Sequence, residues 1–411
     1  MKTTPVKGTN DYLPQETKLR DYLQTSILKT YTEQCFERIT TPIIEDINNL
    51  EHSDGGDNLS LIFKILKRGD KLTSALESGG ELADLGLRYD LTLPLARFYA
   101  EHKNDLNTPF KVIQMGKVYR AERPQKGRDR EFVQCDIDIL GSDSINCEIE
   151  LIHTTSMALL NLGLKNFTIA INDRRILRSV LLWCGFEEKS LDSVCITFDK
   201  LDKLGKAGVI KELFEKGFKE QEINKFDKLL TKLPSTFAEL RLLCGNKQEI
   251  VDLEKIINSV QLLSKGRYNI EFDLSLVRGQ GYYTGTVFEI KSEEYHCSIG
   301  GGGRYDGLIG KFIGQSVPAV GFSIGFERIF SILKEKNILI PHRPMVAIIY
   351  DKDNFVESMA FAEKQKMSYD VCLIECPKKL GKLLCKLEEK GFYGYVVFGE
   401  SGSIKRLGKQ S

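Results

Sequence analysis

The chain has 411 residues, of which 42% are hydrophobic and 28% are charged, and its formal net charge is +1. This makeup is typical of a soluble globular protein, and the length indicates two or three domains. A net charge so small gives no long-range field for nucleic acid, so any RNA partner must meet local basic patches.

Cysteine, histidine and apolar patterns narrow the class further. The ten cysteines contain no C-x-x-C pair and the five histidines form no pair at helical spacing, so we expect no protein-only metal site. No apolar run reaches the roughly 18 residues of a membrane span, and the N-terminus lacks the apolar core of a signal peptide. We expect reduced thiols in a cytoplasmic protein with no membrane segment.

The first part of the chain mixes helical and strand patterns. Residues 19–31 have helical spacing, whereas residues 110–120 have strand character. Antiparallel hairpins outnumber regular strand–helix alternations, which predicts an α+β fold, with an antiparallel sheet flanked by helices. From about residue 173 to 268, Lys, Glu and Leu recur at helical spacing, and this predicts a helical insertion.

Strand patterns resume at 270–276 and 282–290, and a closing helix is predicted at 325–334. The first domain is therefore expected to span residues 1–335, interrupted by the insertion and then completed.

A linker at 336–345 contains two prolines, and the strand–helix alternation after it differs from the pattern of the first domain. Residues 346–411 are predicted to form a small α/β domain, with strands at 346–350, 371–374 and 394–398.

The most informative segment, residues 119–141, predicts a β-hairpin that carries polar chemistry on one face. Alternation in its second strand places Phe132, Gln134, Asp136 and Asp138 on one face and Val133, Cys135, Ile137 and Ile139 on the other. The turn is rich in cations, with Arg120, Arg123, Lys126, Arg128 and Arg130. Forked guanidinium donors near amide and carboxylate acceptors favour a phosphorylated ligand beside a cationic one.

Four other blocks combine glycine, arginine and polar residues: LRYDLTLPLAR (87–97), LVRGQGYYTGTVFE (276–289), GGGRYDGL (301–308) and AVGFSIGFER (319–328). Absent side chains let backbone approach a ligand, and Arg278, Arg304 and Arg328 would add fixed charge. Taken alone, each glycine group is better explained by turns and bulges. No segment matches a P-loop or a dinucleotide-binding fingerprint.

Taken in order, these blocks resemble those of class II aminoacyl-tRNA synthetases, most closely the histidyl-tRNA synthetases. KGTNDYLP (7–14) is similar to the opening of that family, Pro42 to the proline of its dimer-forming motif 1, and the hairpin to motif 2. AVGFSIGFER is similar to motif 3, while the blocks at 276–289 and 301–308 resemble two histidine-specific motifs. The resemblance covers nearly everything to about residue 335 and implies ligation of histidine to tRNA(His), with ATP and Mg²⁺.

The resemblance implies an ATP site built mainly from arginines. Arg120 would hold the α-phosphate, Arg128 and Arg328 the outer phosphates, and Phe132 would stack on adenine with Glu122 near its amino group. Arg278 would lie at the α-phosphate and the substrate carboxylate, and with Arg120 and Arg328 it would form the catalytic set.

The same resemblance implies a histidine site and two further partners. The α-ammonium would meet Asp90, Thr92 and Gln134, and the imidazole would meet Asp138, Tyr282 and Tyr283. Arg123 and Gln125, at the hairpin tip, would contact the acceptor end of tRNA or stay solvated. The motif 1 region would form a homodimer, and residues from about 346 a short anticodon-binding domain.

Two alternatives stay open. A synthetase-like regulatory subunit of ATP phosphoribosyltransferase would sense histidine without catalysis, but it has no use for phosphate-directed arginines. A paralogue could also adenylate histidine and transfer it to an acceptor other than tRNA.

Overall fold

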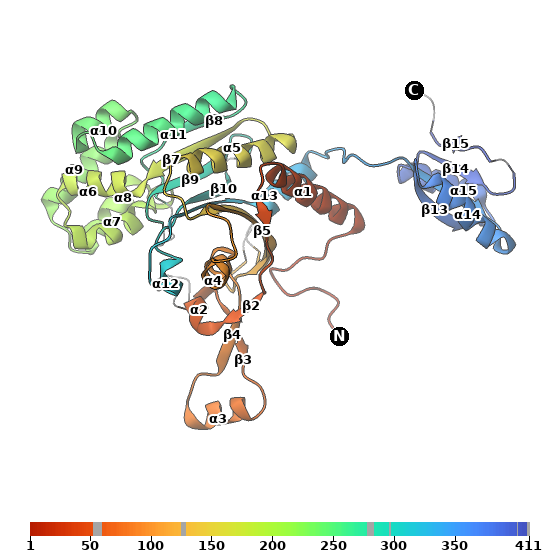
Figure 1. The fold of residues 1–411 in the computed structure, drawn as a ribbon, viewed down its shortest axis with the longest axis horizontal. Helices are drawn as coiled ribbons and strands as arrows, with labels where there is room; N and C mark the ends of the chain where they lie inside the picture. The colour runs from red at the N-terminus through yellow and green to blue at the C-terminus, as the bar shows by residue number, and fades with distance from the viewer. Residues whose placement is uncertain (52–59, 125–128, 278–282, 296, 401, 409–411) are drawn as a thin grey trace. The chain divides into compact units, whose positions relative to one another are not determined.

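The computed structural model describes residues 1–51, 60–124, 129–277, 283–295, 297–400 and 402–408 (Figure 1). The chain forms two compact units, Met1–Asn337 and Ile338–Ser411. Among the described residues, no helix has both the length and the apolar content needed to cross a membrane.

The first unit is built on a mixed eight-stranded sheet. In spatial order the strands are β1 Glu37–Arg38, β5 Phe110–Tyr119, β6 Glu131–Leu140, β11 Ala319–Ile324, β10 Cys297–Arg304, β9 Thr286–Ser292, β7 Phe167–Asp173 and β8 Asn269–Phe272. Neighbours are antiparallel from β5 to β7, whereas the edge pairs β1–β5 and β7–β8 are parallel. The α+β prediction is confirmed, but the sheet is not antiparallel throughout, because a parallel partner needs a long crossover that strand periodicity does not reveal.

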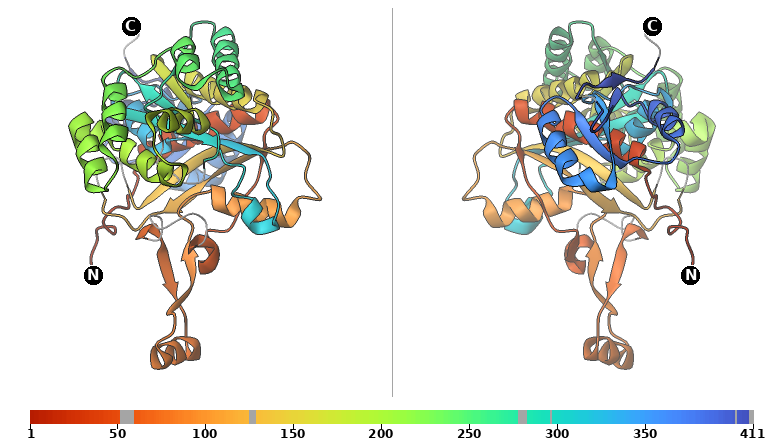
Figure 2. Two further views of the ribbon diagram at one scale, coloured as in Figure 1. Left: turned by 90° about the vertical axis from the view of Figure 1, so that its left-hand side faces the viewer. Right: turned by 90° about the vertical axis from the view of Figure 1, so that its right-hand side faces the viewer.

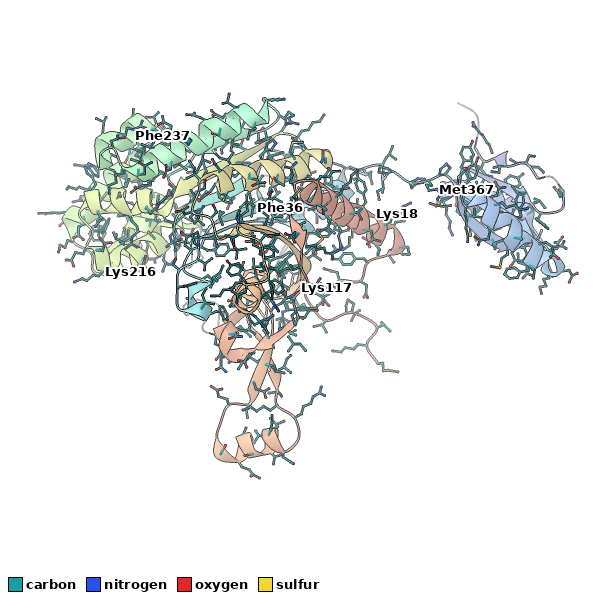
Figure 3. All side chains as sticks on the ribbon, viewed as in Figure 1. Lys18, Phe36, Lys117, Lys216, Phe237 and Met367 are labelled. Atoms are coloured by element: carbon teal, nitrogen blue, oxygen red, sulfur yellow. The ribbon has the colours of Figure 1, made fainter. Side chains whose placement is uncertain are left out.

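Helices cover both faces of this sheet (Figure 1). Helices α5 (Asn146–Asn161) and α13 (Phe326–Glu335) contact β6, and α1 (Pro14–Glu33) packs against both helices. On the other face, α4 (Thr92–His102) shares a buried core with β5, and α12 (Gly310–Ile313) contacts α4. Figure 3 contrasts the buried Phe36, which follows α1, with the exposed Lys18 on that helix.

A helical segment connects the parallel neighbours β7 and β8. Its helices are α6 Arg174–Cys184, α7 Leu191–Phe198, α8 Leu201–Glu215, α9 Glu220–Thr231, α10 Phe237–Cys244 and α11 Gln248–Ser264, with a 3₁₀ turn, η2, at Glu188–Ser190. The buried Phe226 ring holds part of it together, because its centroid lies 5.8 Å from that of Phe186 and 5.4 Å from that of Phe198.

A smaller sheet projects from the first unit (Figure 2). It consists of β2 Ile44–Asp46, β4 Ala83–Leu87 and β3 Phe63–Leu66, with the short helices α2 (Ile47–Glu51) and α3 (Asp70–Ser78) attached. Strand β4 matters for the site, because the chain continues from it directly into Asp90 and helix α4.

The second unit is a four-stranded sheet with two helices. Strands β13 (Asp370–Glu375), β12 (Met345–Tyr350) and β14 (Gly394–Val397) are parallel, and β15 (Lys405–Arg406) pairs antiparallel with β14. The helices are α14 (Phe355–Gln365) and α15 (Leu380–Glu389), and a 3₁₀ turn, η3, spans Lys352–Asn354. The apolar run of β12 supplies the centre of the core, as parallel strands usually do.

Glycines occupy the middle of the main sheet. The run at 300–303 belongs to β10, between β9 and β11, and is therefore neither a turn nor a loop. A Cβ on Gly302 would lie 2.0 Å from the carbonyl oxygen of Gly321, and a Cβ on Gly300 would lie 2.9 Å from that of Ser323. Backbone cannot retreat as a flexible side chain can, so these positions require glycine.

Replacing Gly302 by alanine tests this close approach. We expect Gly302→Ala to lower the free energy of unfolding by about 2 kcal/mol, because overpacking against fixed backbone has this order of cost. Gly307→Ala is the matched control, since a Cβ there meets nothing within 4 Å. Urea titration of the two variants measures the difference, and equal stability would show that β10 and β11 can separate at no cost.

Candidate active site

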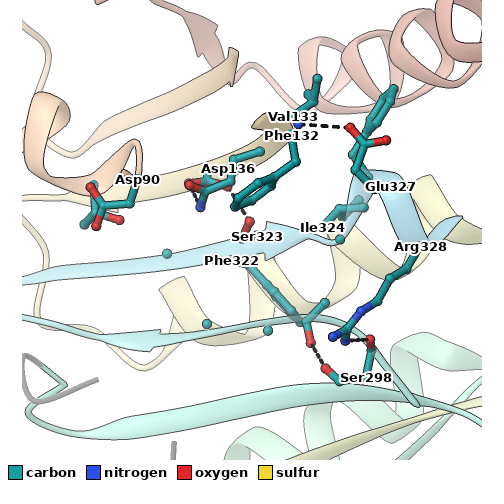
Figure 4. Close-up of a pocket in the computed structure, with 18 of the residues that line it drawn as sticks. Asp90, Phe132, Val133, Asp136, Ser298, Phe322, Ser323, Ile324, Glu327 and Arg328 are labelled. Atoms are coloured by element: carbon teal, nitrogen blue, oxygen red, sulfur yellow. Dashed lines mark hydrogen bonds between the residues drawn. The ribbon is translucent and has the colours of Figure 1, made fainter. Parts of the chain in front are cut away.

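The hairpin predicted at 119–141 is formed by β5 and β6, and its two faces differ as expected. Residues 135, 137 and 139 of β6 are buried on the face that α5 and α13 contact. The opposite face carries Phe132, Gln134, Asp136 and Asp138 into a cavity of about 520 Å³ (Figure 4). The strand that carries them is internal, paired with β5 on one side and β11 on the other.

The cavity collects most of the described residues that the sequence singled out. Those that line it are Asp90, Thr92, Arg120, Glu122, Phe132, Gln134, Asp138, Tyr283 and Arg328. They come from the start of α4, the hairpin, the segment before β9, and α13, which are far apart in the sequence. The cations and the carboxylates therefore line one cavity.

Strand register explains why a cavity exists above the sheet. Asp138 pairs with Gly321 of β11, and Gly321 pairs with Gly303 of β10, so all three lie on one face. A Cβ on Gly321 would lie 1.9 Å from Oδ1 of Asp138, and a Cβ on Gly303 would lie 2.8 Å from the Tyr283 ring. Missing side chains thus leave room for the carboxylate and for the ring.

Asp138 is the most sharply defined acid of the site. Its side chain is buried, and the hydroxyl of Tyr305 donates a hydrogen bond of 2.6 Å to its Oδ1. Burial raises the pKa of Asp138 to about 7, with a further rise from the Asp90 carboxylate and an opposing effect of the Tyr305 hydrogen bond. Tyr305, in the block 301–308, was not predicted as a site residue, although it lies one position after the glycine–arginine run.

Asp136 is a second buried carboxylate on this face. The Ser323 hydroxyl donates to its Oδ1 at 2.5 Å, and Nε2 of Gln134 donates to its Oδ2 at 3.4 Å. Burial and the nearby Asp138 raise the pKa of Asp136 well above its ordinary value. Alternation placed Asp136 on the correct face, but the sequence alone gave it no role.

Two arginines supply positive charge to the same cavity. Arg120 donates from Nε to the carbonyl oxygen of Tyr89 at 3.1 Å, and its guanidinium carbon lies 5.0 Å from the centroid of the Phe132 ring. Arg328 donates to the carbonyl oxygen of Ser298 (Figure 4). These hydrogen bonds to backbone carbonyl groups hold each guanidinium group in position at the cavity.

Glu327, beside Arg328, is a lining residue that the sequence did not single out. Its carboxylate accepts two hydrogen bonds from Arg20 of α1. It also accepts one of 3.1 Å from the backbone N–H of Val133 (Figure 4). Glu327 therefore connects α1, α13 and the hairpin. Only tertiary structure reveals this function, because the partners are more than 190 positions away.

One expectation about charge was wrong. Arg304 does not line the cavity; it makes a buried bidentate pair with Glu148, with N–O distances of 2.7 and 2.8 Å. Gly303 lies on the cavity face of β10, so alternation turns the next side chain, Arg304, to the opposite face. There it pairs with Glu148 and joins β10 to helix α5.

Several predicted residues are not in the described cavity. Gln125, Arg128, Arg278 and Tyr282 lie outside the described residues, and their roles stay predictions. Arg123 is exposed and is not a lining residue. Over the described ranges, no three His, Cys, Asp or Glu side chains gather closely enough to hold a metal ion.

Comparison with known proteins places this architecture in a family. The family model described as histidyl-tRNA synthetase matches residues 8–329. The histidine–tRNA ligase of Leifsonia xyli is 44% identical over 85% of this chain and 84% of its own length. That of Cytophaga hutchinsonii is 34% identical over 96% of this chain and 92% of its own.

Solved structures agree. The histidyl-tRNA synthetase of Nostoc sp. PCC 7120 matches with a TM-score of 0.80 and 27% identity over 97% of this chain and 91% of that chain. An ATP phosphoribosyltransferase regulatory subunit/histidyl-tRNA synthetase from Bacillus halodurans matches with a TM-score of 0.78 over 94% and 97%, but at 21% identity it shows the fold alone. With its sequence matches and the arrangement of its cavity, the chain belongs to the histidyl-tRNA synthetase family.

Proposed function

We propose that this chain is a histidine–tRNA ligase, which activates L-histidine with ATP and transfers it to the 3′ end of tRNA(His). Family membership supports the ligase activity, and two ligases of this name align with most of the chain. The observation that carries the site assignment is the single cavity in which Arg120 and Arg328 meet Asp90 and Asp138.

We propose that the arginines bind ATP. The histidine carboxylate attacks the α-phosphate and pyrophosphate leaves, so the protein must align the reactants and neutralise charge developing on phosphorus oxygens. Arg120 would act at the α-phosphate with Arg278, while Arg328 and Arg128 would act at the outer phosphates. Phe132 would stack on adenine beside Glu122, a placement supported by the position of both residues at the cavity.

We propose that the acidic part of the cavity binds histidine. Asp90, Thr92 and Gln134 would meet the α-ammonium, and Asp138 would accept from an imidazole N–H with Tyr283 and Tyr282 alongside. A buried carboxylate that is already hydrogen-bonded to Tyr305 supports this, because it gives the ring a fixed acceptor. Amino acids without that N–H would leave Asp138 with the Tyr305 hydroxyl but without the second donor that the imidazole would supply.

The remaining partners are proposals of the same kind. Mg²⁺ would enter bound to the phosphates of ATP. Arg123 and Gln125 would approach the tRNA acceptor end, the second unit would bind the anticodon, and two copies would associate through the motif 1 region around Pro42. Ten unpaired cysteines support a reducing compartment, which we take to be the cytoplasm.

The alternative is a regulatory subunit of ATP phosphoribosyltransferase that senses histidine, and the Bacillus halodurans structure is described as a regulatory subunit of that enzyme as well as a synthetase. Such a sensor needs the acidic pocket but not phosphate-directed cations. Because Arg120 and Arg328 line the same cavity as Asp138, we favour ligation.

Histidine-dependent exchange of labelled pyrophosphate into ATP tests the activity. We expect exchange with the intact chain and a loss of about 100-fold or more in Arg120→Ala, the usual effect of removing a donor to developing charge. Arg123→Ala is the matched control, since that exposed arginine does not line the cavity. If the folded protein binds histidine yet shows no exchange, the sensor is the better description.

The pH dependence of histidine binding tests Asp138. Its carboxylate is the form that accepts from imidazole, so affinity should rise as pH increases through about 7. In Tyr305→Phe the hydrogen bond that favours the carboxylate is lost, so the pKa should rise and the midpoint should move up by about one unit.

The control for this titration is Tyr268→Phe. Tyr268 is buried and hydrogen-bonded to His153 but does not line the cavity. The pH midpoint of histidine binding in Tyr268→Phe should equal that of the intact chain. Superimposable profiles for all three proteins would remove Asp138 from the histidine site.

A further inference from the structure

One acceptor in the cavity has no donor among the residues that the structure describes. Oε1 of Gln134 is buried and accepts no hydrogen bond from them, although the side chain lines the cavity. A buried unpaired acceptor costs about 1–3 kcal/mol, so native proteins rarely keep one without a reason. The atom requires an N–H or O–H donor, and the described part of the chain does not supply one.

Asp136 determines which end of the Gln134 amide is left over. Nε2 of Gln134 donates to Oδ2 of Asp136, so the amide nitrogen faces the carboxylate. When Asp136 is ionised, turning the amide by 180° would place its carbonyl oxygen against a carboxylate oxygen, which is repulsive because both are acceptors. The carboxylate therefore keeps Oε1 as the available end.

Asp136 is itself held by the sheet. Ser323 is its register partner on β11 and donates to Oδ1, so the carboxylate accepts from two donors at once. Asp136 is 4% exposed, which leaves it little freedom to turn. Ser323, Asp136 and Gln134 thus form one chain of hydrogen bonds that ends at the orphan oxygen.

The electrostatics favour a cationic donor. Burial raises the pKa of Asp136 most, Asp138 and Asp90 raise it further, and the Ser323 hydrogen bond and Arg120 lower it. A positive charge entering among these carboxylates would favour their ionised forms. A neutral hydroxyl could donate to Oε1 but would add no positive charge to offset the negative charge of the carboxylates.

We infer that Asp136 is a positioning residue for the α-ammonium of the amino acid, and that it acts through Gln134 by keeping the amide oxygen available as an acceptor. This rests on the proposed histidine-activating function. Asp136 then sets affinity for the amino acid without contacting it, which distinguishes it from Asp90 and Asp138.

A double-mutant cycle tests the inference, with Asp136→Ala, Gln134→Ala and the pair of substitutions. Equilibrium binding of L-histidine is measured for each, together with the KM for ATP in pyrophosphate exchange. Asp136→Ala should weaken histidine binding about tenfold in the intact background, and by less than about twofold when Gln134 is already alanine. The KM for ATP should stay within about twofold.

A second probe separates positioning from a structural effect. Imidazolepropionate, which lacks the α-ammonium, should bind the intact chain and Asp136→Ala alike. Ser323→Ala, which removes only the hydroxyl that holds Asp136, should give a smaller loss for histidine that also disappears in the Gln134→Ala background. It serves as the test if Asp136→Ala does not fold.

The outcomes are distinguishable. An equal loss of histidine affinity with and without Gln134, or an equal loss for imidazolepropionate, overturns the inference and leaves the proposed function standing. An intact chain that binds no histidine overturns the proposed function before the cycle begins.

Discussion

The site depends on the register of three neighbouring strands. Because β6, β11 and β10 align Asp138 with Gly321 and Gly303, a carboxylate lies next to two positions that have no side chain. The backbones at Gly302 and Gly321 also approach too closely for a Cβ. One pattern therefore does two things: it closes the centre of the sheet, and it opens a hollow above it. A shift of one residue would turn the acids into the helical layer.

The hairpin brings acidic, aromatic and cationic side chains to one cavity. The inner part of β6 carries Asp136 and Asp138, and its outer part carries Phe132, next to Arg120 at the end of β5. Under the proposed function, Asp138 and Asp90 would meet the amino acid, and Arg120 and Arg328 would meet the phosphates. The proposed attack of the histidine carboxylate on the α-phosphate needs no protein nucleophile, since alignment of the reactants and compensation of charge suffice. Glu327 keeps the hairpin and α13 together, so the arginine that follows it is held against the same space.

Sequence patterns predicted what is local. Alternation placed Phe132, Gln134, Asp136 and Asp138 on the face that lines the cavity, and the helical spacing at 19–31 falls within α1. Patterns failed where the answer depends on distant partners. The glycine run at 300–303 was explained by turns and bulges, but it lies in a central strand whose neighbours require close backbone approach. The sequence predicted Arg304 as a ligand-binding cation, but in the structure it pairs with Glu148, 156 positions away. The roles of Tyr305, Asp136 and Glu327 depend on partners on other elements. A short stretch of sequence around each residue does not contain those partners.

A crystal structure with a non-hydrolysable histidyl-adenylate analogue tests the central claim most directly. The account predicts the adenine against Phe132, the phosphate beside Arg120, an imidazole nitrogen within hydrogen-bonding distance of Asp138, and the α-ammonium on Oε1 of Gln134. An analogue bound elsewhere, or bound here with its imidazole toward the arginines, would contradict it.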